Sequence, residues 1–172
     1  MWYAILGAVL LAGDQILKYW VVTHLAVGES APFLPGFMQL TRLHNYGAAW
    51  SSLSGRTVLL VVFTAVLLAA VALLLIKKVV RHWTGITACT LILSGGIGNI
   101  IDRIVHGYVV DMFDLQLFSY PVFNLADCCV VVGAILGGIY YLFLYEKYDK
   151  KKKEPDLSLI HISEPTRRRG IS

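Results

Sequence analysis

The segment from Thr57 to Ile76, TVLLVVFTAVLLAAVALLLI, contains no charged side chain. A helix of about 20 apolar residues is long enough to cross the hydrocarbon core of a bilayer. The whole chain of 172 residues is 57% hydrophobic and has a mean hydropathy of +0.67, which is too apolar for an ordinary soluble domain. The sequence therefore predicts a polytopic membrane protein.

Three further apolar segments lie on either side of this one, at about residues 2–23, 84–102 and 124–145. We expect an all-α fold of four transmembrane helices that form a single domain over residues 1–150. Residues 151–172 are expected to form a cytoplasmic tail. Within that tail, residues 154–172 follow no amphipathic pattern, and we expect them to be non-native or disordered.

The basic residues predict the topology. The net charge is +4, and the basic side chains cluster at Lys77, Lys78 and Arg81 and again over residues 147–153. Cytoplasmic loops carry an excess of Lys and Arg, so both clusters and both termini are expected in the cytoplasm, and segments 25–56 and 103–122 outside. Because topology explains these basic residues, we expect no nucleic-acid partner. The first apolar segment lacks a basic start and is expected to be retained.

The longer external segment is expected to form a small β-platform. Apolar and polar residues alternate from Phe37 to Leu43, after turn residues that include Pro32 and Pro35. This pattern predicts short strands that lie on the membrane surface. Segment 103–122 is rich in aromatic residues, which are typical of the membrane interface.

Two acidic residues lie at the ends of apolar stretches. Asp111 follows Val109 and Val110, and Asp127 is three residues after Asn124 at the start of the last apolar segment. A carboxylate near the membrane core costs several kcal/mol unless it is paired or hydrated, so it indicates function by default. Two carboxylates that share a proton can activate water. The alternative is structural, with helix capping and loop solvation, and Asn124 suits a capping position.

Other polar residues could support such a pair. Asp14 and Lys18 share a helical face, either as a structural ion pair or as support for the site. Asn99, Asp102 and Arg103 also share one face, where Arg103 would bind substrate oxygens or form a surface pair with Asp102. Asn45 and Gly47 predict a tight turn, in which Asn45 could also bind a substrate backbone. These alternatives remain open at the level of the residues.

Other chemistries lack the residues that they need. The five histidines share no ligand spacing, and the three cysteines, Cys89, Cys128 and Cys129, have neither metal-ligand nor disulfide spacing. Motifs of serine hydrolases, of nucleotide-binding loops and of dinucleotide-binding folds do not occur. We therefore expect no metal site and no cofactor, and we expect the cysteines to act as small buried hydrophobic residues.

Five motifs together resemble one family, the lipoprotein signal peptidases, or type II signal peptidases, of bacterial membranes. They are Asp14-Gln15-x-x-Lys18, Asn45-x-Gly47-Ala48-Ala49-Trp50, Gly95-Gly96-x-Gly98-Asn99-x-x-Asp102-Arg103, Val109-Val110-Asp111 and Phe123-Asn124-x-Ala126-Asp127. They occur in the order of the family. Met112 and the pair Cys128-Cys129 depart from its usual pattern at positions that are not catalytic.

The resemblance implies an intramembrane aspartic endopeptidase that removes the signal peptide of diacylglyceryl-modified prolipoproteins and cuts before the lipidated cysteine. It implies that Asp111 and Asp127 are catalytic, and that the following residues bind substrate or support the site: Asn45, Gly47, Asn99, Arg103, Asn124, Asp14, Lys18 and Asp102. The enzyme would act as a monomer among membrane lipids in the bacterial inner membrane, with its site near the external face.

The alternative function is a small proton-coupled carrier or channel component, because acids and Arg103 within the spans could mark an ion path. Against it, the chain shows no internal repeat of the kind that transporters use.

Overall fold

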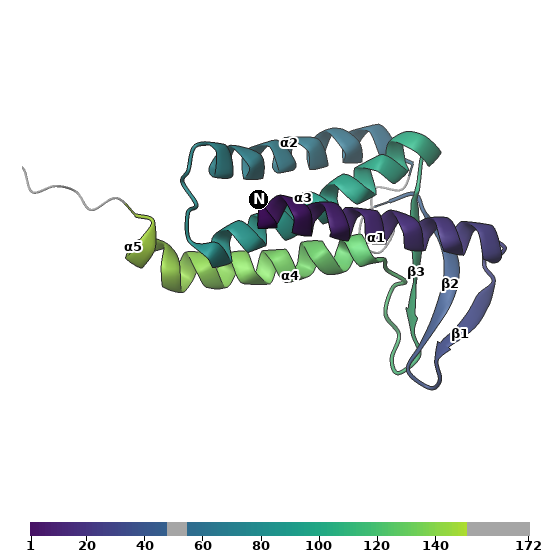
Figure 1. Cartoon of the computed structure of the whole chain (residues 1–172). Helices are drawn as coiled ribbons and strands as arrows, with labels where there is room; N and C mark the ends of the chain where they lie inside the picture. Colours follow the sequence, from purple (N-terminus) through teal and green to yellow (C-terminus); the bar gives the residue numbers. More distant parts are fainter. Residues whose placement is uncertain (48–54, 151–172) are drawn as a thin grey trace, which may run out of the picture.

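The computed structural model describes residues 1–47 and 55–150. Four helices are long and apolar enough to cross a membrane, and a small antiparallel sheet crosses one end of the bundle (Figure 1). The elements are α1 (Trp2–His24), β1 (Ser30–Leu34), β2 (Met38–Asn45), α2 (Thr57–Ile76), α3 (Trp83–His106), β3 (Val109–Leu115) and α4 (Leu125–Ile139), which continues through the π-helical turn η2 (Tyr140–Leu144) into α5 (Tyr145–Tyr148).

Helix α3 is the centre of the bundle, because it packs against each of the other three spanning helices. Three of its glycines permit the close approach. A Cβ atom on Gly95 would collide with the carbonyl oxygen of Ala126 in α4, one on Gly96 would lie 2.6 Å from Leu68 in α2, and one on Gly98 would lie 2.8 Å from Asp14 in α1. Small residues that let helix backbones approach are the usual basis of packing inside lipid.

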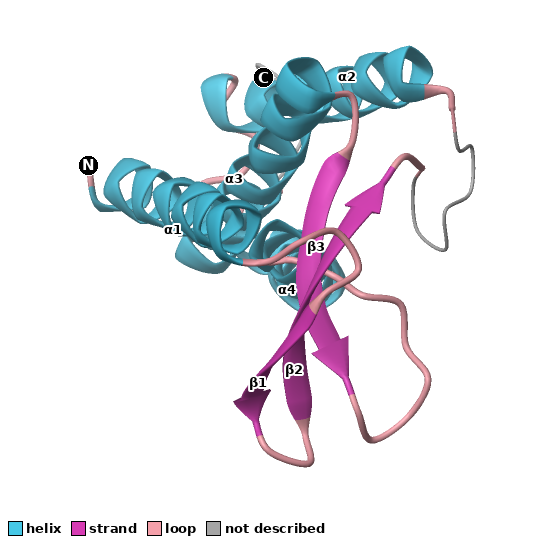
Figure 2. Cartoon of the chain, turned by 90° about the vertical axis from the view of Figure 1, so that its right-hand side faces the viewer, coloured by secondary structure: helices cyan, strands magenta, loops and turns pink. Residues whose placement is uncertain are grey.

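The sheet joins segments that are far apart in the sequence. Strand β2 lies between β1 and β3 and pairs antiparallel with both. Val110 and Met112 of β3 are fully buried against Val21 and Leu25 at the end of α1. Figure 2 shows the strands crossing in front of the helix ends. The end of α1 therefore fixes the sheet across one end of the bundle.

At the opposite end of the bundle, Asp149 connects the chain between α2 and α3 to the end of the fourth spanning helix. Its buried carboxylate accepts hydrogen bonds from the Tyr140 hydroxyl and from the backbone N–H groups of Arg81 and His82, at 2.5, 3.0 and 3.0 Å. Burial alone would raise the pKa of Asp149, but these bonds outweigh it and lower the pKa to about 2. This carboxylate ties the α2–α3 connection to the end of the fourth span.

The fold confirms the four spans and the strands in segment 25–56, but the all-α description is wrong because the sheet has three strands. The third strand comes from segment 103–122, for which the sequence predicts an external position at the membrane interface and no strand. The third apolar segment continues as helix to His106, and the fourth continues to Tyr148. Ala48, Ala49 and Trp50 of the second motif, and the predicted tail over 151–172, lie outside the described residues.

Candidate functional site

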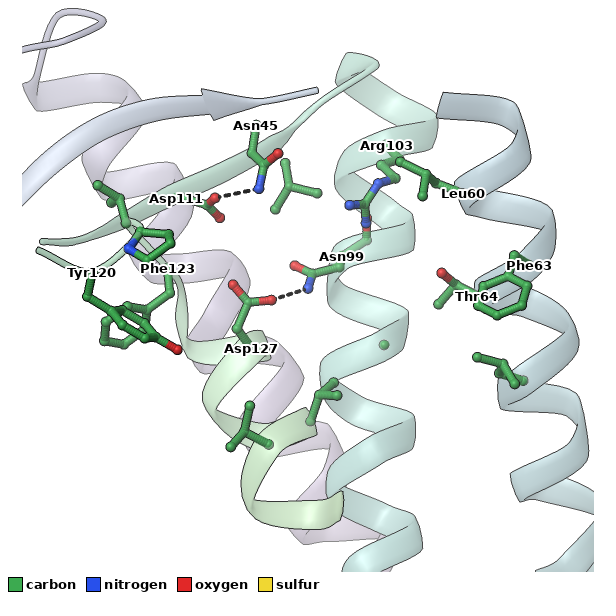
Figure 3. Close-up of a pocket in the computed structure, with 17 residues that line it drawn as sticks. Asn45, Leu60, Phe63, Thr64, Asn99, Arg103, Asp111, Tyr120, Phe123 and Asp127 are labelled. Carbon is green, nitrogen blue, oxygen red and sulfur yellow. Dashed lines mark hydrogen bonds between the residues drawn. The ribbon is translucent and has the colours of Figure 1, made fainter. Parts of the chain in front are cut away.

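Asp111 and Asp127 line the same cavity, of about 500 Å³, although one lies on a strand and the other on a helix (Figure 3). Asp111 is in β3, and Asp127 is in the first turn of α4. After β3 the chain returns along the same strand, and the backbone of Phe123 exchanges hydrogen bonds of 2.7 and 3.2 Å with Phe113. This return fixes the start of α4 beside Asp111.

Asp127 is held by the cap of its own helix. The Asn124 side chain accepts a 2.8 Å hydrogen bond from the Asp127 backbone N–H, and the Asp127 carboxylate accepts one of 3.2 Å from the Asn124 backbone. This reciprocal pair is a capping box, which satisfies two backbone donors at the helix start. The other carboxylate oxygen of Asp127 accepts a 2.8 Å bond from the Asn99 side chain. The predicted capping role of Asn124 is confirmed.

Asp111 is 1% exposed, and both its oxygens accept hydrogen bonds. The donors are the side-chain amides of Asn124, at 2.7 Å, and Asn45, at 2.9 Å. Burial raises the pKa of Asp111 to about 7, and the nearby charge of Asp127 adds to the rise, against the opposing effect of the two amide bonds. A carboxyl with this pKa can carry a proton near neutral pH.

The orientations of the two asparagines are determined by their neighbours. The Asn99 side-chain oxygen accepts from Lys18 at 3.1 Å and from Asn124 at 3.2 Å, so its NH₂ group faces Asp127. The Asn124 oxygen is occupied by the backbone N–H of Asp127, so its NH₂ group faces Asp111. Such a fully bonded buried network holds its members in one arrangement.

Lys18 is buried between two carboxylates, Asp14 at 2.8 Å and Asp102 at 2.9 Å. The predicted pair of Asp14 and Lys18 therefore forms, and Asp102 joins it; among the described ion pairs, none links Asp102 to Arg103. Gln15, whose role the sequence does not predict, donates to both carboxylates.

The same two carboxylates bind the backbone next to each site acid. Asp14 accepts a 2.9 Å bond from the N–H of Ala126, and Asp102 accepts one of 3.1 Å from the N–H of Val110. Ala126 and Val110 are the residues directly before Asp127 and Asp111. The Lys18 cluster therefore fixes the backbone that carries both acids.

Arg103 lines the cavity and holds the turn after β2. Its guanidinium donates to the carbonyl oxygens of Gly47, at 2.8 Å, and Asn99, at 3.3 Å. The Gly47 N–H in turn donates to the Asn45 side-chain oxygen at 2.9 Å, a local bond that bends the chain directly after β2. Arg103 therefore positions the loop that carries Asn45, and its location on the cavity wall also lets it face a bound molecule.

The rest of the cavity wall is mostly apolar. It is formed by one face of α2, which includes Leu60, Phe63 and Leu67, and by residues 120–123 before α4. No pattern in the sequence distinguishes the α2 face that lines the cavity, because that helix is apolar on all sides. The cavity therefore combines an apolar wall with two carboxylates at its polar end, which suits an apolar chain with a hydrolysable bond.

Within residues 1–47 and 55–150, no group of three or more histidines, cysteines or acids has the arrangement of a metal site. The three cysteines are free; Cys89 and Cys129 are buried, and Cys128 is partly buried. The chemical groups that the site offers are therefore carboxylates, amides and one guanidinium.

Comparisons with known proteins agree with each other. A family described as signal peptidase (SPase) II matches residues 6–143. A lipoprotein signal peptidase of Enterococcus faecalis is 41% identical over 151 residues, which cover 88% of this chain and 93% of that protein. A lipoprotein signal peptidase of Clostridium acetobutylicum is 37% identical over 141 residues, which cover 80% and 92%. A solved bacterial membrane enzyme has a TM-score of 0.76 and 34% identity, over 89% of this chain and 93% of its own.

Proposed function

Because this chain belongs to the signal peptidase II family of lipoprotein signal peptidases, we propose that it is an aspartic endopeptidase whose catalytic residues are Asp111 and Asp127. Its substrate is a diacylglyceryl-modified prolipoprotein, from which it removes the signal peptide by cutting before the lipidated cysteine. The observation that carries the proposal is the pair of carboxylates, fully hydrogen-bonded at the polar end of one apolar cavity.

In the proposed mechanism the pair shares one proton. The ionised carboxylate takes a proton from a water molecule, and the hydroxide so formed attacks the scissile carbonyl. The protonated carboxyl donates to the carbonyl oxygen, and the resulting tetrahedral intermediate then collapses as the leaving amine takes up a proton. The raised pKa of Asp111 is consistent with one shared proton near neutral pH. A coupled pair titrates as a unit, so the proton belongs to the pair.

The supporting residues have two roles in this proposal. Asn45, Asn99 and Arg103 line the cavity, where they orient the carboxylates and contact the extended substrate next to the scissile bond, and Asn124 and the backbone at Gly47 hold these groups in place. Asp14, Lys18 and Asp102 hold the backbone of the two acids and do not touch substrate. This division follows the lining of the cavity, which includes Asn45, Asn99 and Arg103, whereas Asp14 and Asp102 bind the backbone beside the acids and do not line it.

The four spans make this a multi-pass membrane protein. We propose that both termini are cytoplasmic, that the site lies near the external face of the bacterial inner membrane, and that the enzyme acts as a monomer. The carrier or channel alternative is not favoured, because the family is a peptidase family.

The test uses purified protein and a lipid-modified precursor peptide. Asp111→Asn and Asp127→Asn should each reduce cleavage by a factor of about 10² or more, the usual contribution of a positioned acid or base. Asp114→Asn is the matched control: this acid lies on the same strand but binds Gln39 and Thr41 and does not line the cavity. Normal turnover by either cavity variant would refute the proposal.

A further inference from the structure

Thr64 is the single polar side chain in α2 after the first residue of that helix, Thr57. Every other residue from there to Ile76 is alanine, valine, leucine, isoleucine or phenylalanine. Thr64 lines the cavity that holds the two acids. Because a hydroxyl in apolar surroundings is costly unless it forms a hydrogen bond, its place on the cavity wall indicates a polar partner within the cavity.

The pairing of α2 with α3 fixes the depth of Thr64. The Thr57 hydroxyl donates to the carbonyl oxygen of the C-cap residue of α3 at 3.1 Å. Leu68 packs so closely on Gly96 of α3 that a Cβ atom there would lie 2.6 Å away. Since the two helices run in opposite directions between these contacts, Thr64 lies beside residues 99–101 of α3.

This depth is that of the reacting groups, because Asn99 donates to the Asp127 carboxylate at 2.8 Å. Figure 3 shows the Thr64 hydroxyl on the side of α2 that faces Asn99. Thr87 and Thr90 of α3 donate to the backbone carbonyl four residues earlier, at 2.9 and 2.8 Å. In the part of the chain that the structure describes, Thr64 makes no such bond, so its hydroxyl is available to a bound molecule.

The surroundings of Thr64 indicate which substrate group it meets. Asn45, Asn99 and Arg103 line the polar end of the cavity, where they can serve the donors and acceptors of a peptide backbone. Thr64 instead has apolar side chains of α2 one turn to either side of it on the cavity wall. A single hydroxyl donor in an apolar wall suits an acceptor that is attached to a hydrocarbon chain. The ester carbonyl of an acyl chain is such an acceptor.

We propose that the Thr64 hydroxyl donates a hydrogen bond to an ester carbonyl of the diacylglyceryl group on the precursor. This inference rests on the proposed function, in which the lipidated cysteine directly follows the scissile bond. Thr64 then binds the lipid at the depth of the two acids, and the apolar face of α2 contacts the acyl chains.

The test compares two synthetic precursor peptides of the same sequence. Their cysteine carries either an ester-linked diacylglyceryl group or an ether-linked dialkylglyceryl group of the same chain length, which has no carbonyl oxygen. Steady-state kinetics in detergent are measured for the native protein, for Thr64→Val, which removes the hydroxyl, and for Thr64→Ser, which keeps it. Val62→Thr is the matched control, because Val62 is 55% exposed on α2 and does not line the cavity.

On the ester precursor, Thr64→Val should raise KM by about threefold to tenfold, as expected for the loss of one hydrogen bond. The kcat should stay the same, because the bond is equally present before and during the reaction. Thr64→Ser should keep the native KM. On the ether precursor the native protein should already show the raised KM, and Thr64→Val should add nothing to it. Val62→Thr should change neither value.

An equal rise in KM on both precursors would overturn the inference, because the hydroxyl would then act on the peptide or on helix packing. An unchanged KM on both would overturn it as well. If the native protein cleaves neither precursor, the proposed function itself fails, and the inference fails with it; cleavage of the ester precursor separates the two cases.

Discussion

At the scale of single residues, Asp111 has a pKa of about 7, so its protonation changes in the physiological range. Burial is the largest cause, and the charge of Asp127 is the second. The hydrogen bonds from Asn45 and Asn124 act in the opposite direction, because they stabilise the ionised form. The pH range of activity therefore depends on the side chains around Asp111, and each of them can be substituted separately.

Asn45→Ala should move the pH profile of cleavage upward. The pair needs one proton, so kcat/KM should fall as the pH rises above about 7 and both acids ionise. Loss of the Asn45 bond raises the pKa of Asp111, so this decline should begin at higher pH. Gln39→Ala, which removes a bond to Asp114 instead, should leave the profile in place. A downward shift for Asn45→Ala would show that the bond does not stabilise the ionised form.

Arg103→Lys should be harmful although it keeps the charge. Lysine cannot bridge Gly47 and Asn99 with the planar fork that Arg103 uses. Loss of charged hydrogen bonds costs about 1.5–3 kcal/mol, or about a tenfold to hundredfold fall in kcat/KM. If Arg103 mainly positions substrate, the loss should appear largely in KM.

Steady-state kinetics on Arg103→Lys and Arg103→Ala measure this, with Arg56→Lys, at an exposed position before α2, as control. Unchanged kcat/KM in both Arg103 variants would exclude a role in the reaction.

At the scale of elements, the sequence predicted the spanning helices, which follow from composition, and missed the strand that forms only through pairing with a distant segment. The bounds of α2 agree with the prediction because 20 apolar residues leave no other arrangement in a bilayer. Strand β3 was missed because residues 109–115 gain their partner only when β2, more than 60 residues earlier, lies beside them. The alternation in β2 was visible because its apolar and polar residues fall on opposite faces.

The polar site shows the same limit. Helical spacing predicted the pair of Asp14 and Lys18, since both residues lie on one helix. Spacing could not show that Asp102 forms its ion pair with Lys18 instead of with Arg103, the next residue in the sequence. The partner of Asp102 depends on how α1 packs against α3. It also could not show that Asp14 binds the backbone of α4.

Gly95→Ala should weaken the contact of α3 with α4. The added methyl group collides with the carbonyl oxygen of Ala126, which is backbone and cannot rotate away. Overpacking of this kind costs about 1–3 kcal/mol, and cleavage should fall as well because Ala126 precedes Asp127. Thermal unfolding in detergent measures the first effect and turnover the second.

Gly138→Ala is the matched control on α4, where a Cβ would meet nothing within 4 Å. It should be neutral or stabilise the helix by up to about 1 kcal/mol. Equal unfolding temperatures for the two variants would mean that α3 and α4 approach less closely than described.

At the scale of the whole molecule, the charges and the site lie at opposite ends of the bundle. The exposed basic residues Lys77, Lys78 and Arg81 follow α2, whereas Asp111 and Asp127 lie where α4 begins. If the positive-inside rule holds here, the site must face outward. The orientation of the protein in the membrane thus decides on which side of the bilayer cleavage takes place.

A reporter fused after Tyr148 should be active only if it works in the cytoplasm, and one inserted at Gly55 only if it works outside. Alkaline phosphatase, which needs an oxidising compartment, should therefore be active at Gly55 and inactive after Tyr148. A green fluorescent protein fusion should give the reverse pattern and serves as the control for expression. Phosphatase activity after Tyr148 would invert the proposed topology.

The capping box at the start of α4 decides which inactive variant is better suited to a structure of the enzyme with a bound precursor. Asp127 closes the first turn of its helix as well as facing the cavity, so an amide at that position changes both the reaction and the helix end. Asp111 has no such second duty, because only side-chain amides bind its oxygens. Asp111→Asn is therefore the better trap for cryo-EM or crystallisation: it removes the reacting carboxylate and leaves the cap of α4 intact, and it gives up one hydrogen bond from Asn45 or Asn124 because an amide has a single acceptor oxygen.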